Sequence, residues 1–208
     1  MVSNPFWCKT VSEYKNETKR WIEAPDMQNY MDLAIFFDSF AVAGDKDLLI
    51  NLKDDLFNKL HDKDVFMAYF AKATLTFDTP NTIANFMTKS HNIDIKKAAV
   101  FPIVQGIRSL ALREKIRETT TVKRIKILEE KKILERSKAA ELLEAFDVVN
   151  TLRLKAQLDD IQDNKEVNNE IDTHTLGKIE RDLLKDSFKI VIEFKKFINY
   201  TFRIDKIS

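Results

Sequence analysis

The chain has 208 residues, of which 44% are hydrophobic and 32% charged, an ordinary composition for a globular protein with a sizeable core. The formal net charge is +1, so no overall field favours binding to nucleic acid or to an anionic membrane. A single cysteine, Cys8, excludes an internal disulfide framework and fits a reducing compartment.

Turn-forming residues are scarce along the whole chain. It holds three glycines and four prolines, fewer than hairpin-rich sheets or glycine-rich phosphate loops require. It has no leader of charged and then apolar residues, and no uncharged apolar run of about 18 residues. We therefore expect a cytoplasmic, all-α protein with no membrane segment, built from long helices with short connections.

In the first part of the chain, apolar residues at intervals of three and four predict a series of amphipathic helices. The first runs from Asn4-Pro5 to Ala24-Pro25. Three more are expected over residues 27–36, 46–60 and 64–75, with Asp45 and Asp64 as N-cap residues.

The segment from Ala98 to Leu112 is apolar on nearly every side, which is typical of a helix at the centre of a bundle. Pro102 should kink this helix or lie in its first turn. Gly106 should allow a neighbouring helix to approach closely. The polar exceptions within the segment are Gln105, Arg108 and Ser109.

Three further helices complete the prediction. They are a charged helix capped by Thr121, a long helix from Ser137 to about Asp163, and a last long helix that begins at Thr173 after a polar linker. The apolar stripe of the last helix includes Ile179, Leu183 and Phe194. We expect a single domain over residues 1–208, a bundle of about seven to nine helices with two long antiparallel members at its C-terminal end.

Charge is distributed unevenly along the second half. Residues 96–138 contain thirteen Lys/Arg and five Asp/Glu, whereas residues 139–186 contain six and twelve. One interpretation is that helices of complementary charge pack side by side with their outer faces in solvent. The other is that the basic part forms a wall that meets phosphate or an acidic partner.

The sequence lacks the motifs of a self-sufficient enzyme. Its histidines, His61, His91 and His174, lie far apart and away from Cys8, so no zinc site is expected. No Gly-Ser or Gly-Gly turn precedes acidic residues on strands, as the two-metal site of a polymerase-beta-type nucleotidyltransferase requires. We expect no catalytic residues, no metal site and no cofactor in this chain.

Polar side chains on apolar helix faces are the candidate binding residues. Arg108 lies within the most apolar helix, and Asn150, Arg153 and Gln157 share one face of the following long helix. An unpaired buried guanidinium is costly, so these arginines should meet carboxylates or reach a polar cleft. The candidate partners are Asp38, Asp45 and Asp147. Either a structural ion-pair lattice or a pocket for a phosphate or carboxylate satisfies this requirement.

Four segments carry a family resemblance: FFDSFAVAGD (36–45), IDIKKAAVFPIVQGIRSLALREKIRETTTVKRI (93–125), EAFDVVNTLRLKAQL (144–158) and LLKDSFKIV (183–191). They resemble the putative nucleotidyltransferase substrate-binding domain. That family forms the C-terminal helical part of bacterial signal-transduction proteins. These proteins also carry cyclic-nucleotide-binding or CBS modules and a nucleotidyltransferase domain similar to PII-protein uridylyltransferase. The chain departs from the family at Phe40 and Ala41, where arginine and proline are common.

The resemblance implies a non-catalytic substrate-recognition or regulatory domain, the C-terminal part of a longer protein. It implies that Arg108, Arg113, Arg124, Arg153 and Gln157 face the cleft towards a catalytic domain, oriented by Asp38 and Asp45. Mg²⁺ and a nucleoside triphosphate are expected only in that catalytic domain, in cis or in trans. A PII-like protein or a nucleotide is the implied binding partner.

An alternative function is a helical interaction or dimerisation module with no small-molecule site. Aromatic residues expected at the surface near Phe6 and Trp7, together with the charge split, favour this alternative.

Overall fold

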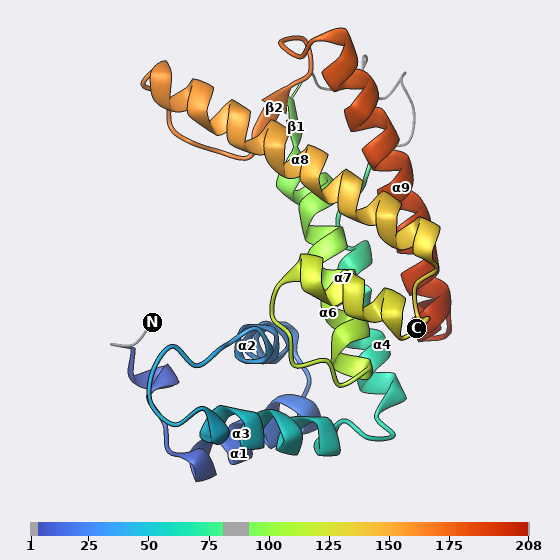
Figure 1. Ribbon diagram of the computed structural model, residues 1–208. Helices are drawn as coiled ribbons and strands as arrows, with labels where there is room; N and C mark the ends of the chain where they lie inside the picture. The colour runs from blue at the N-terminus through green and yellow to red at the C-terminus, as the bar shows by residue number, and fades with distance from the viewer. Residues whose placement is uncertain (1–3, 81–91, 208) are drawn as a thin grey trace.

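The computed structural model describes residues 4–80 and 92–207, which form helices, one small sheet and the loops that connect them (Figure 1). The elements are η1 (Pro5–Trp7), α1 (Val11–Glu23), α2 (Met27–Phe37), α3 (Lys46–Lys59), α4 (Asp64–Lys72), η2 (Ala73–Leu75), β1 (Asn92–Asp94), the π-helix η3 (Lys96–Val100), α6 (Phe101–Arg113), α7 (Thr121–Glu130), α8 (Arg136–Gln162), β2 (Glu170–Asp172), α9 (Lys178–Phe202) and η4 (Ile204–Lys206). The eight α-helices of the described residues confirm the predicted all-α bundle.

Helices α1, α2 and α3 pack on one another and form one end of the molecule, at the lower left in Figure 1. Trp21 of α1 is fully buried, and its ring lies 6.0 Å from that of Phe36 in α2. The single helix predicted from Asn4 onward is divided in two. Pro5–Trp7 forms a 3₁₀ turn, and Thr10 opens α1 through a capping box with Glu13.

The predicted helix starts are correct at α3 and wrong at three other places. Asp45 caps α3 by accepting the N–H of Asp47 at 2.9 Å. Asp64 and Thr121 are instead the first residues of α4 and α7, so neither is an N-cap residue. The last helix starts at Lys178 rather than at Thr173, because a strand ends at Asp172, a turn follows in which Thr175 donates to the Asp172 carbonyl, and Gly177 is the N-cap residue.

That strand, β2, lies in the linker predicted to be irregular. It pairs antiparallel with β1, with Ile93 opposite Ile171. Ile171 is buried, so a single apolar residue anchors the otherwise polar linker to the body of the molecule.

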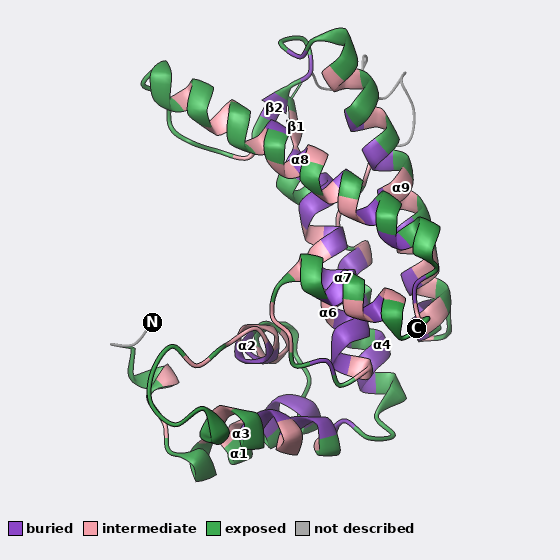
Figure 2. Cartoon of the chain, in the orientation of Figure 1, coloured by how far each residue is buried: buried purple, intermediate pink, exposed green. Residues whose placement is uncertain are grey.

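Helix α6 packs against α4, α7 and α9, and buried residues follow it along most of its length (Figure 2). Pro102 lies in its first turn, as predicted. A proline cannot donate the helical hydrogen bond to the carbonyl four residues earlier, which here belongs to Ala98. The Thr79 hydroxyl donates to that carbonyl at 2.7 Å, so Thr79 satisfies the acceptor that the proline leaves.

The two long helices α8 and α9 pack together and run in opposite directions (Figure 1). Leu184 and Phe188 of α9 are buried, whereas Ile179 and Leu183 are 77% and 41% exposed. The core stripe predicted for this helix therefore starts one turn later than expected. Among the described residues, no helix combines the length and the apolarity needed to cross a membrane.

The close approach predicted at Gly106 is present. A Cβ atom added there would lie 2.5 Å from Cε1 of Phe194 in α9, which is too close for carbon atoms. We expect Gly106→Ala to destabilise the protein by about 1–3 kcal/mol through overpacking. Urea unfolding of Gly106→Ala, Phe194→Leu and the double variant tests this. The double variant should be more stable than the sum of the single effects predicts. Simple additivity would show that the contact does not limit the position.

Candidate anion-binding site

The end of α2 is where the N-terminal helices meet the rest of the chain. The Tyr30 ring of α2 lies 5.3 Å from the Phe66 ring of α4, and the Phe37 ring lies under the guanidinium of Arg124 in α7, 4.5 Å from its carbon atom. Asp38, the C-cap residue of α2, follows directly. The packing of α2 therefore places the Asp38 carboxylate next to α6 and α7.

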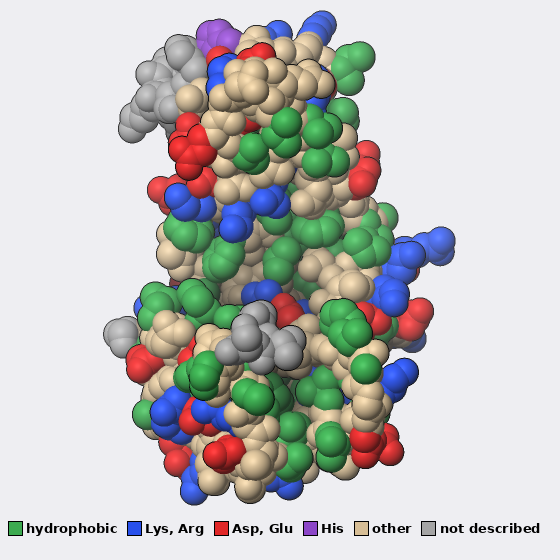
Figure 3. All heavy atoms as spheres, turned by 90° about the vertical axis from the view of Figure 1, so that its left-hand side faces the viewer, with side chains coloured by type: hydrophobic (Ala, Val, Ile, Leu, Met, Phe, Trp, Pro, Cys, Tyr) green, Lys and Arg blue, Asp and Glu red, His purple; other side chains and the backbone are tan. Residues whose placement is uncertain are grey.

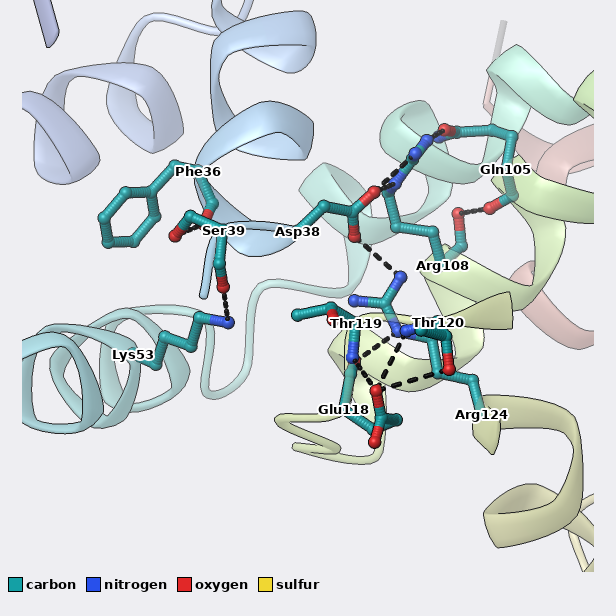
Figure 4. A network of polar contacts seen from close by, with 11 residues as sticks. Phe36, Asp38, Ser39, Lys53, Gln105, Arg108, Glu118, Thr119, Thr120 and Arg124 are labelled. Carbon is teal, nitrogen blue, oxygen red and sulfur yellow. Dashed lines mark hydrogen bonds and ion pairs between the residues drawn. The ribbon is translucent and has the colours of Figure 1, made fainter. Parts of the chain in front are cut away.

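The Asp38 carboxylate bridges two arginines (Figure 4). Its Oδ2 atom accepts hydrogen bonds from Nε and Nη2 of Arg108 at 2.9 and 2.6 Å. Its Oδ1 atom forms an ion pair with Nη1 of Arg124 at 2.7 Å. Gln105, one turn before Arg108 on α6, accepts from Nη1 of Arg108 at 2.6 Å. One carboxylate thus holds guanidinium groups from two helices, as sequence analysis proposed for Asp38 and Arg108.

Arg124 is the most deeply buried charged residue of this group, with 1% of its surface exposed. Its Nε atom donates to the Glu118 carbonyl at 2.6 Å. Its Nη2 atom is buried and has no hydrogen-bond partner in the described residues. Burial lowers the pKa of Arg124, an effect that neighbouring Asp38 opposes. The cluster therefore holds a guanidinium with unused donor capacity.

Glu118 is a neighbouring carboxylate that accepts backbone hydrogen bonds and forms an ion pair with Lys123 at 3.5 Å. It accepts the N–H groups of Thr120 and Thr119 at 3.0 and 2.7 Å, just ahead of α7. These bonds lower the pKa of Glu118 to about 2, and the bond from Thr120 has the largest effect. Glu118 thus fixes the backbone just ahead of α7, whereas the helix itself has no side-chain cap in the described residues.

Lys53 of α3 is a buried cation that sequence analysis missed. It is 4% exposed, and its Nζ atom donates to the Ser39 carbonyl at 2.6 Å. Burial, with the Arg124 charge as the next cause, lowers the pKa of Lys53 to about 8. The available signal was its spacing: Lys53 lies four residues after Leu49 and three before Leu56, on the apolar stripe of its helix.

The face on the left in Figure 1 is hollowed between the N-terminal helices and the rest of the chain (Figure 3). Basic and acidic side chains lie at the floor of the hollow, and hydrophobic side chains surround it. The side chains of Arg108 and Asp38 are 15% and 28% exposed, whereas that of Arg124 is 2% exposed. Solvent therefore reaches Arg108 and Asp38 but hardly reaches Arg124.

The remaining candidate residues lie elsewhere. Arg113 pairs with Glu114 at 3.0 Å and lines a cavity at the end of α9. Arg153 donates to the Asn169 side chain at 2.7 Å, and Gln157 donates to the Asn168 carbonyl at 3.1 Å. Both side chains therefore hold the segment before β2 against α8.

Two of the three proposed carboxylate partners do not take that role. In the residues that the structure describes, Asp45 makes no ion pair with an arginine, because its carboxylate caps α3. Asp147 is exposed on α8 and likewise has no ion pair in that part of the chain. The prediction that Asp45 orients the arginines is therefore wrong, and Asp38 alone bridges them.

The charge split does not produce complementary packing through ion pairs. Within residues 4–80 and 92–207, the basic and acidic segments form ion pairs inside themselves, such as Lys155 with Glu180 at 2.5 Å, but none with each other. In the same residues no group of three or more His, Cys, Asp or Glu side chains could hold a metal ion. His91 lies outside the described residues.

Residues 64–202 match the family model described as putative nucleotidyltransferase substrate binding domain. Arg108 and Arg124 lie within the matched range, whereas Asp38 and Lys53 precede it. No curated protein and no solved structure matches the chain.

The bridging role of Asp38 predicts a large effect of removing its charge. We expect Asp38→Asn to destabilise the protein by about 2–4 kcal/mol, since two largely buried guanidinium groups then lose their carboxylate. Asp45→Asn is the matched control and should change stability by less than about 0.5 kcal/mol, because aspartate and asparagine cap helices equally well. Chemical unfolding measures both. Equal effects would show that Asp38 carries no special share of stability.

Burial of Lys53 predicts a pH effect whose sign follows from its lowered pKa. Between about pH 8 and 10.5 the unfolded chain binds the Lys53 proton and the folded chain does not, so stability rises with pH across this range. The rise should reach up to about 3 kcal/mol. Unfolding of the natural chain and of Lys53→Met over this range isolates the contribution, because other titrating groups are common to both. Parallel pH profiles would contradict it.

Proposed function

We propose a function from the premise that this chain belongs to the family of putative nucleotidyltransferase substrate binding domains: it recognises the substrate and does not catalyse the transfer. The parent system is a bacterial, cytoplasmic signal-transduction protein whose nucleotidyltransferase domain is similar to PII-protein uridylyltransferase. That catalytic domain, in cis or in trans, holds the Mg²⁺ and the nucleoside triphosphate. The described chain supplies the recognition surface.

The observation that carries the proposal is the excess of positive charge around Asp38. Three cations, Arg108, Arg124 and Lys53, face two carboxylates, those of Asp38 and nearby Glu118, so one positive charge is left over. An uncompensated cation in a low-dielectric site attracts an anion strongly. The cluster therefore favours a negatively charged group of the substrate.

Guanidinium groups suit a phosphate because they donate parallel hydrogen bonds to its oxygens. Arg108 is the arginine that solvent reaches, so we assign to it the direct contact with the anion. Asp38 holds both arginines in place, and Gln105 accepts from Nη1 of Arg108, so the second hydrogens of Nη1 and Nη2 are the donors that would contact the anion. Arg124 and Lys53, which are buried behind Arg108, add positive potential. The cluster is thus preorganised to bind a phosphate or a carboxylate of a partner protein.

Calorimetric titration with a nucleoside triphosphate, and separately with inorganic triphosphate, tests this function. We expect Arg108→Gln to weaken binding by about tenfold to a hundredfold, the usual effect of losing a charged hydrogen bond. Arg153→Gln is the matched control, since Arg153 contacts Asn169 and not the cluster, and it should bind like the natural chain. Equal affinities in all three proteins, with the fold intact by circular dichroism, would remove the site.

A second candidate function, a dimerisation module, is favoured by an apolar stripe on α8. Leu154, Leu158 and Ile161 lie on one side of this helix and are 57%, 50% and 58% exposed. Of the two aromatic residues expected at the surface, Phe6 is 37% exposed, whereas Trp7 is half-buried and packs against Trp21 with ring centroids 6.3 Å apart. A dimer whose mass by light scattering does not change with concentration, combined with no triphosphate binding, would favour this function.

A further inference from the structure

A cavity of about 450 Å³ lies where the start of α4 and the ends of α6 and α9 meet. A turn that follows α9 forms one wall of this cavity. Arg203 adopts a left-handed conformation with φ of 54°, which non-glycine residues seldom do. This turn brings η4 back against α4 and buries Ile204, so the C-terminal end of the described chain lies beside α4 (Figure 1). The cavity is therefore shaped by packed elements on several sides.

Positive charge dominates the lining of this cavity. Arg113, Arg203 and Lys206 line it, against one carboxylate among the lining residues, that of Asp64. Arg113 pairs with Glu114, whereas Arg203 and Lys206 form no ion pair in the described part of the chain. The cations outnumber the carboxylates even when Glu114 is included. An anion is the ligand charge that balances the cavity.

The start of α4 adds backbone donors to the same place. No side chain of the described residues caps this nine-residue helix, whose first two residues line the cavity: Val65 and Asp64, which carries the one carboxylate of the lining. Uncapped N–H groups at a helix start, together with the positive end of the helix dipole, favour an anion. The start of α4 therefore adds to the attraction that the three cations exert on an anion.

The inner wall of the cavity is apolar. Met67 and Phe202 are buried and line it together with Ile207. The guanidinium carbon of Arg113 lies 5.0 Å from the centroid of the Phe202 ring, which joins the basic and the apolar parts. The volume falls within the range of about 300–1,000 Å³ typical of small-molecule sites.

We propose that this cavity binds an organic phosphate, a phosphate group joined to a flat or apolar group. Arg203, Lys206 and the start of α4 contact the phosphate, and Phe202 contacts the apolar part. The site is separate from the Asp38 cluster. Arg108 and Arg113 lie five residues apart on α6, so their side chains leave the helix in directions about 140° apart. The proposal does not depend on the function assigned to the cluster.

Calorimetric titration with adenosine monophosphate, and with inorganic phosphate as a second probe, tests the proposal. The test variant is Arg203→Gln with Lys206→Gln, which removes two charges. Position 203 still carries a side chain, so the cost of its left-handed backbone conformation is about the same as in the natural chain. The control is Lys126→Gln with Lys131→Gln, which removes the same charge from exposed positions of α7 and its end. We expect adenosine monophosphate to bind the test variant at least about tenfold more weakly and to bind the control normally. Inorganic phosphate should bind more weakly than adenosine monophosphate because it leaves the apolar wall empty.

The same titrations in the Arg108→Gln background separate the two sites. Adenosine monophosphate binding that survives Arg108→Gln and is lost with Arg203→Gln and Lys206→Gln supports the cavity. Binding that is lost with Arg108→Gln alone, an equal loss in the control, or no binding to the natural chain at millimolar concentration would overturn the proposal. Thermal unfolding of each variant shows that the fold is retained.

Discussion

The Asp38 carboxylate is the constraint on which the junction of the molecule depends. Burial of two guanidinium groups near each other is unfavourable unless an anion lies between them, and Asp38 is placed there by the last turn of α2. The ion pairs of Asp38 join the end of α2 to α6 and α7, and the Phe37 ring packs against Arg124 beside them. The placement of α2 relative to α6 and α7 therefore depends on these ion pairs.

Under the proposed function, the cluster has a structural and a binding role that compete for the same charge. A buried ion pair contributes little net stability compared with apolar packing, but it specifies the relative placement of the elements that it joins. The three cations Arg108, Arg124 and Lys53 outnumber the two carboxylates, Asp38 and Glu118, that act on them, which goes beyond what placement alone requires. Charge left over after the structural contacts is what a ligand can use.

Local periodicity predicted the helices well, because α2 and α8 needed only apolar spacing and start signals. The pairing of Arg108 with Asp38 also followed, since a charge in the most apolar helix requires a partner. Contacts that join distant segments could not be predicted in this way. Strand β2 forms only because β1, far away in the sequence, is there to pair with it. Nothing local shows that Arg153 would meet Asn169 rather than a ligand, and a lysine such as Lys53 is ordinarily assigned to the surface.

The π-turn ahead of α6 has a consequence for how the chain can tolerate changes in length. There the Phe101 N–H bonds to the Lys96 carbonyl, five residues back instead of four, so this turn contains one residue more than an α-helical turn. Loss of a single residue at this point would leave the Phe101 N–H bonded to the Lys96 carbonyl four residues back, which is an ordinary α-helical turn, and would nearly keep the orientation of α6 relative to β1. Loss of a residue within α6 itself, before Arg108, would instead rotate everything beyond it by about 100° and turn Arg108 and Arg113 away from their present neighbours. The π-turn is thus a place where the chain can become shorter by one residue without redirecting these arginines.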